Sequence, residues 1–206
     1  MTSTAVRQDG RRLVVGTLLY VGGLLLYALA QRWTWRDPSV IAWQPFDHMV
    51  PPQPLAVWIY ISLYIMILVP WWSAPRWDQV RLMAWRLSLS MLIGCALFVV
   101  FPTTILRPAL PAADGATTAV ICWIHRLDQP GNALPSMHAV FGILIMLAGW
   151  QVMPCLRWIR VMWLVWLVLV LWSCIAIRQH TWLDLAGGLM LGALVVRLVR
   201  PSESTS

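Results

Sequence analysis

The sequence predicts an all-α integral membrane protein, a single domain over residues 1–206 in which six transmembrane helices form a bundle with both termini in the cytoplasm. Three observations predict this fold class. First, 60% of the residues are hydrophobic and 11% are charged, and the mean hydropathy of +0.71 is typical of a chain surrounded by lipid. Second, the apolar residues fall into six long runs. Third, arginines are unequally divided between the two sides of these runs.

Each apolar run comes close to the length that a helix needs to cross the hydrocarbon core of a bilayer, roughly 18 residues or more. Trp, Arg or Pro bounds every run, as expected where a helix leaves the hydrocarbon for the membrane interface. The fourth run is the shortest and follows a turn at Pro135. In chain order we expect the helices at residues 13–30, 55–72, 80–101, 137–152, 158–177 and 182–199.

The first run has an alternative interpretation. It follows Arg11-Arg12 and ends in Ala28-Leu29-Ala30, which is also the pattern of a secretory signal with a small-residue cleavage site. The run is nevertheless long enough to span a bilayer, and Gly22-Gly23 suits close packing of helices. We therefore interpret it as the first transmembrane helix. Cleavage would leave the orientation of the other runs unchanged.

Arginine supplies all of the basic side chains, since the chain has no lysine. Ten of the 15 arginines lie on the side of the N-terminus, and the positive-inside rule places that side in the cytoplasm. The same rule accounts for the net charge of +7. The charge forms no basic stripe of the kind that binds nucleic acid, so we expect no nucleic-acid partner. The opposite, extracytoplasmic side has five arginines: Arg32, Arg36, Arg107, Arg126 and Arg178.

The longest stretch between two runs covers residues 102–136. A segment of this length within a compact domain is usually functional or contains a helix of its own. We expect residues 117–124 to form a helix on the bilayer surface, where it lines an access path for lipid. His125, Arg126 and Asp128 follow it directly.

A histidine and an aspartate mark the start of the last run. His180 and Asp184 are four residues apart, so on a helix they share one face. The carboxylate can then accept a hydrogen bond from one ring nitrogen, fix the tautomer and stabilise an imidazolium, as a nucleophilic histidine requires. A lone histidine near the end of a span is often only structural. The aspartate is harder to dismiss, because an intramembrane carboxylate is costly without a partner.

Two further strings on the same side are suited to a phosphate. In Pro135-Ser136-Met137-His138, the serine opens a helix whose free N–H groups and hydroxyl form a phosphate cradle. His138 would stand beside that phosphate as general acid and then general base. Arg107, before Pro108, carries a planar fork that matches phosphate oxygens. Taken singly, these features also fit an ordinary capped helix and an arginine extended toward the interface.

The order of these motifs resembles the type 2 phosphatidic acid phosphatase superfamily of membrane lipid phosphatases. The shared order is Arg-Pro, then Pro-Ser-x-His at the start of a span, then Ser-(x6)-His-(x3)-Asp, and it covers about residues 47–192. The branch that includes inositol phosphorylceramide synthase-like proteins is the most similar. Its Pro-Ser-Leu-His and Lys-Gln-His-Tyr-x-x-Asp resemble residues 135–138 and 178–184 here. Asp47, before Pro51-Pro52-Gln53-Pro54, also matches a feature of that branch.

The resemblance implies a six-helix bundle and a metal-independent mechanism through a phosphohistidine. In this chain it implies that His180 is the nucleophile, that Asp184 orients it and that His138 is the general acid and base. It also implies that Arg107 and Ser136 bind the phosphate.

Two cations of the superfamily pattern are replaced in this chain. Val100 stands where the first motif has a lysine, and Cys174 stands where the third motif has an arginine. Arg178 and Arg126 are the candidates to replace them as phosphate ligands. On a continuous helix Arg178 would point away from the face of His180, so it can serve only if the helix ends there.

We expect neither a cofactor nor a metal. The cysteines are widely spaced, without the pattern of a zinc site or a disulfide framework, and the sequence shows no cluster of carboxylates: Cys95, Cys122, Cys155 and Cys174.

The sequence therefore predicts an integral lipid-phosphate phosphatase of the plasma or inner membrane, with its site on the extracytoplasmic face. Its partners would be membrane lipids and a substrate of the phosphatidate, phosphatidylglycerol phosphate or polyprenyl pyrophosphate type. One alternative is a phosphotransferase that uses a lipid hydroxyl as acceptor. Another is a non-catalytic membrane scaffold or transporter, which the clustering of the polar residues at one face disfavours.

Overall fold

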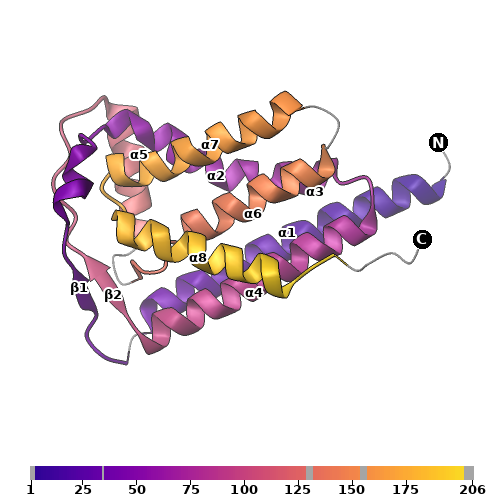
Figure 1. The fold of residues 1–206 in the computed structure, drawn as a ribbon, viewed down its shortest axis with the longest axis horizontal. Helices are drawn as coiled ribbons and strands as arrows, with labels where there is room; N and C mark the ends of the chain where they lie inside the picture. Colours follow the sequence, from indigo (N-terminus) through magenta and orange to yellow (C-terminus); the bar gives the residue numbers. More distant parts are fainter. Residues whose placement is uncertain (1–2, 34, 129–131, 154–156, 202–206) are drawn as a thin grey trace.

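The computed structural model describes residues 3–33, 35–128, 132–153 and 157–201 (Figure 1). The fold is mostly helical, as the sequence predicts. Its α-helices are α1 (Ser3–Arg32), α2 (Val57–Met66), α3 (Leu68–Ser73), α4 (Trp77–Val100), α5 (Gly115–Leu127), α6 (Met137–Val152), α7 (Arg157–Ala176) and α8 (Trp182–Leu198). Two short 3-10 helices, η1 (Pro45–Met49) and η2 (Pro54–Ala56), and two strands, β1 (Ser39–Ile41) and β2 (Thr103–Ile105), complete it.

Four stretches of the described chain are helical, long and apolar enough to cross a membrane: Val14–Arg32, Pro54–Ser73, Trp77–Val100 and Arg157–Ala176. The other two predicted spans are α6, with 16 residues, and α8, with 17. At 1.5 Å per residue a helix of 16 residues is about 24 Å long, shorter than a hydrocarbon core of about 30 Å. The count of six spans therefore remains a prediction.

Helix α6 lies at the centre of the bundle. Its buried side chains join two apolar clusters, one shared with α1, α4 and α8 and the other with α2, α3 and α7. A helix enclosed on these sides has little surface facing lipid. Because the neighbouring helices cover it on all of these sides, α6 is apolar throughout. Helices α6 and α8 start at the same end of the bundle, and α1 starts at the opposite end (Figure 1).

Two glycines bring α8 against α6. A Cβ at Gly188 would collide with the carbonyl oxygen of Ser136, and one at Gly192 would collide with the side chain of Ile143. The small-x-x-x-small spacing of the two glycines is typical of helices that approach each other closely. Beside this contact, the N–H of Ser136 donates to the carbonyl oxygen of Asp184 at 3.0 Å. The Pro-Ser-x-His and His-x-x-x-Asp motifs are thus fixed to one another through the backbone.

The end of the bundle where α6 and α8 start is covered by α5 and a small sheet (Figure 1). Strands β1 and β2 pair in parallel, with Val40 opposite Thr104. They are three residues long, and their pairing joins segments far apart in the chain, so the sequence does not predict them. Helix α5 contains the predicted surface helix and extends it in both directions. The carboxylate of Asp114 caps it, accepting from the N–H of Thr117 at 2.9 Å.

Candidate active site

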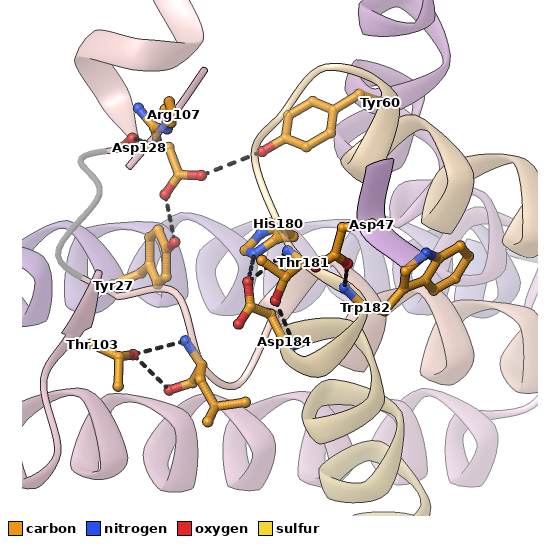
Figure 2. A network of polar contacts seen from close by, with 11 residues as sticks. Tyr27, Asp47, Tyr60, Thr103, Arg107, Asp128, His180, Thr181, Trp182 and Asp184 are labelled. Atoms are coloured by element: carbon orange, nitrogen blue, oxygen red, sulfur yellow. Dashed lines mark hydrogen bonds and ion pairs between the residues drawn. The ribbon is translucent and has the colours of Figure 1, made fainter. Parts of the chain in front are cut away.

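The starts of α6 and α8 bring the two motif histidines together. His138 lies in the first turn of α6, and His180 lies just before the capping residue of α8. The centroids of the two imidazole rings are 5.5 Å apart. Both side chains are buried, and Figure 2 shows His180 facing the group around Asp128 and Asp184.

His180 and Asp184 do not share a continuous helix. Because α8 begins at Trp182, Asp184 is its third residue and serves as part of the helix cap. Its Oδ2 accepts from the N–H of Thr181 at 2.8 Å, and the same oxygen lies 3.6 Å from Nδ1 of His180 (Figure 2). The predicted pairing of His180 with Asp184 is therefore present, at a distance typical of an ion pair. The other ring nitrogen of His180, Nε2, has no partner.

The turn before α8 places His180. Helix α7 ends at Ala176, and Arg178 takes a φ of 59°, which is uncommon for a residue other than glycine. The N–H groups of Gln179 and His180 then donate to the carbonyl oxygen of Cys174 at 3.0 and 3.2 Å. This strained turn fixes the backbone on both sides of the imidazole.

His180 and Asp184 are more buried than their position at the end of a span suggests. Side chains at the open end of a helix face water, yet His180 is 4% exposed and Asp184 is fully buried. The apolar cluster around them explains the difference. It joins η2 and α2 to α5 and the end of α7, so these elements cover the start of α8.

His138 is held by two tyrosines of α2. Its ring stacks on Tyr60, with centroids 4.2 Å apart and planes at 30°. Its Nε2 lies 3.5 Å from the hydroxyl of Tyr64, and its Nδ1 has no partner. These contacts fix the plane of the imidazole beside His180.

Asp128 is part of the site, although its sequence pattern predicts no role for it. Its carboxylate accepts hydrogen bonds from Tyr27 at 2.6 Å and Tyr60 at 3.3 Å (Figure 2). It also accepts one from Gln31 at 2.8 Å. An Asp128 oxygen, a His138 nitrogen and a His180 nitrogen all lie within 4.8 Å of one another. The sequence argument against a metal is therefore incomplete, because the fold gathers a His/Asp set that the linear spacing does not reveal.

Arg107 reaches the same site from the segment after β2. One of its terminal nitrogens donates to the carbonyl oxygen of Asp128 at 2.6 Å, and its Nε has no partner. It lines a small polar pocket with Asp128, Gln179 and His180. Partial burial and the nearby Arg107 lower the pKa of His125 on α5.

The two other predicted phosphate ligands lie elsewhere. Helix α7 does end before Arg178, but the guanidinium donates to the carbonyl oxygens of Asp47 and Val50 at 3.2 and 3.0 Å and lies over the ring of Trp43. Desolvation lowers the pKa of Arg178. Arg126 is exposed in the last turn of α5. These contacts suit Arg178 to holding the 43–50 segment rather than a phosphate.

Asp47 anchors the start of α8. Its Oδ1 accepts from the N–H of Trp182 at 2.8 Å (Figure 2). Its Oδ2 accepts from the N–H of Gln44 at 2.7 Å. The residue is fully buried. It thus joins η1 to the helix that carries Asp184, a connection that explains why an aspartate stands so far before the histidines.

Replacing Asp47 tests this anchor. Asp47→Ala leaves two partly buried N–H groups without this acceptor, at a cost of at most about 1–3 kcal/mol for each. We expect a lower thermal unfolding temperature in detergent, measured by tryptophan fluorescence. His48→Ala, at the exposed neighbouring position, is the matched control and should leave that temperature unchanged. Equal unfolding temperatures for the two variants would contradict the anchor.

Ser136 completes the site as the residue before α6. It is fully buried, and its Oγ has no partner. Several other buried polar atoms of the site also have no hydrogen-bond partner. They are Nδ1 of His138, both ring nitrogens of His180, Oδ1 of Asp184, Nε of Arg107 and both amide atoms of Gln179. Unpaired buried polar atoms are rare in folded proteins, because each costs free energy. These donors and acceptors are therefore available to a polar ligand.

One of three comparisons with known proteins found a match. The model of a family described as the PAP2 superfamily matches residues 27–198, which is most of the chain. The match includes every motif residue of the site. No curated protein and no solved structure matches the chain significantly.

Proposed function

The chain belongs to the PAP2 superfamily, and from this membership we propose that it is an integral membrane lipid-phosphate phosphatase that works through a phosphohistidine at His180. Membership itself supports an enzyme of the phosphatase or phosphotransferase type, and the apolar helices are those of a membrane protein. The substrate would be a phosphomonoester or pyrophosphate on a lipid. The likeness to inositol phosphorylceramide synthase-like proteins remains a prediction within that family.

The observation that carries the proposal is the group of unpaired buried atoms around His138 and His180. A phosphate offers acceptors to the N–H groups at the start of α6, to the hydroxyl of Ser136 and to the guanidinium of Arg107. It would satisfy these donors together and stand next to the nitrogen of His180 that Asp184 leaves free.

The two histidines divide the reaction. Nε2 of His180 attacks phosphorus while the bond from phosphorus to the lipid oxygen breaks, and Asp184 beside Nδ1 stabilises the cationic ring. His138 gives a proton to the departing lipid oxygen. It then takes a proton from water, whose oxygen attacks phosphorus and breaks the N–P bond. Inorganic phosphate leaves, and both histidines return to their starting states.

A panel of lipid phosphates tests the proposal. Purified protein in detergent should release inorganic phosphate from at least one of phosphatidate, phosphatidylglycerol phosphate and a polyprenyl pyrophosphate. Release should continue in EDTA and should stop with vanadate, which imitates a five-coordinate phosphorus. A requirement for Mg²⁺ in the chemical step, or no release from any of the lipids, would contradict the proposal.

The site is proposed to face away from the cytoplasm. Its support is the arginine count, together with the position of the site at the end of the bundle opposite the start of α1 (Figure 1). In a cysteine-free background, Ala112→Cys before α5 should react with an impermeant maleimide in intact cells. Arg157→Cys at the start of α7 should react only after lysis. The reverse labelling pattern would place the site in the cytoplasm.

A phosphotransferase is the second candidate, and the carboxylate of Asp128 favours it. Among the described residues that line the polar pocket, Arg107 is the cation and Asp128 is the anion. With Val100 and Cys174 in place of two cations, the site has less positive charge than the superfamily pattern. Such a site suits the single negative charge of a phosphodiester better than a phosphomonoester with two charges. A lipid hydroxyl would then take the place of water in the second step.

A further inference from the structure

The carboxylate of Asp128 lies beside His138 and His180, and phosphate binding does not explain an anionic group at that position. We propose that these three side chains bind a divalent transition-metal ion of the zinc class, and that the bound ion blocks the site. The blocking effect rests on the proposed function, because it requires His180 to be the nucleophile. The binding itself does not.

The three side chains come from three elements that the fold brings to one point. Asp128 follows α5, His138 is in the first turn of α6, and His180 precedes α8. Their ligand atoms lie within 4.8 Å of one another. A tetrahedral zinc ion has ligand distances of about 2.0–2.2 Å, which place its ligand atoms roughly 3.5 Å apart. Side-chain movements of about 1 Å would therefore close the set around an ion.

Neighbouring groups already hold the ligands as they are held in metal sites. Ligating carboxylates usually accept other hydrogen bonds, and ligating histidines usually turn their second nitrogen toward a carboxylate. Asp128 accepts from Tyr27, Gln31 and Tyr60. Nδ1 of His180 lies 3.6 Å from Asp184, which leaves Nε2, an atom without a partner, as the nitrogen available to an ion.

The chemistry of the set indicates the class of ion. Two imidazoles and one carboxylate are ligands for Zn²⁺, Co²⁺ or Cu²⁺, whereas Mg²⁺ and Ca²⁺ favour sites made of oxygens. Three protein ligands leave one coordination position for water. Because the ion takes the same nitrogen of His180 that attacks phosphorus, metal and substrate exclude one another.

Cobalt reports binding without any need for turnover. We expect purified protein, stripped with a chelator, to take up one Co²⁺ per chain with the visible absorption of a site that has nitrogen ligands. Zn²⁺ should displace the cobalt, and Mg²⁺ should not. Asp128→Asn should raise the dissociation constant at least about tenfold, and His180→Gln should abolish the absorption. His125→Gln, at a half-buried histidine outside the set, is the matched control and should bind as the wild type does.

The outcomes separate this proposal from the proposed function. An active phosphatase without the cobalt absorption, or one whose absorption survives in both His180→Gln and Asp128→Asn, would overturn the metal site alone. A protein that binds cobalt but hydrolyses no lipid phosphate would overturn the proposed function alone. If Asp128→Asn does not fold, X-ray absorption of the zinc-loaded wild type decides, since it should show two imidazoles in the first shell. Activity that is unchanged when zinc saturates the site would overturn the blocking effect.

Discussion

His180→Ala should reduce phosphate release by at least about 10³-fold, because the substitution removes the atom that forms the covalent intermediate. No other imidazole can replace it: the ring of His138 is held by Tyr60 and Tyr64 and would have to do both tasks. The measurement is release of inorganic phosphate from the best lipid of the panel, at saturating substrate.

The buried position of His180 requires a test of folding beside the kinetic one. Neither ring nitrogen has a hydrogen-bond partner, so removing the ring breaks no buried hydrogen bond, and the cost is that of a cavity and of the 3.6 Å contact with Asp184. His180→Ala should therefore still elute as a single species in detergent. His125→Ala is the matched control, since it removes a half-buried histidine at the same end of the bundle. Retention of more than about a tenth of the activity would show that another group attacks phosphorus.

Local features of the sequence predict the helices that position the site. Helix α6 occupies the predicted residues, and α8 starts at the predicted residue and ends one residue earlier. Pro135 and the polar residues before Trp182 mark these starts clearly, because an apolar run cannot continue through them. The glycine spacing on α8 likewise predicts a close helix contact, and the structure identifies α6 as the partner.

The features that the sequence misses depend on contacts between distant segments. Asp128 belongs to the site because α1 supplies Tyr27 and Gln31 to its carboxylate, and no local spacing indicates that contact. Arg178 turns toward Asp47 and Val50 because of a turn at a positive φ, which residue type does not predict there. The burial of Asp184 likewise depends on distant segments, because η2, α2 and α5 cover the start of α8.

His138→Gln should separate the two chemical steps. His138 acts in both the phosphorylation of His180 and the hydrolysis of the phosphohistidine. With a nitrophenyl phosphate ester the phosphorylation no longer needs His138, because nitrophenolate leaves without being protonated. The variant should then give a burst of nitrophenolate equal to the amount of enzyme, followed by turnover slower than the wild type by about 10²–10⁴-fold. The protein should hold phosphate in an acid-labile, base-stable N–P bond.

The trapped intermediate also decides between water and a lipid as the second acceptor. With labelled lipid phosphate, wild-type protein should form mainly free phosphate, and added diacylglycerol, ceramide or inositol lipid should barely change the rate. If a lipid acceptor captures most of the label, the phosphotransferase replaces the phosphatase, and His138 activates a lipid hydroxyl by the same removal of a proton. His125→Gln should show no burst and normal turnover with the nitrophenyl ester. Absence of a burst in His138→Gln, with slow turnover from the first cycle, would mean that His138 does not control the second step, whichever acceptor is used.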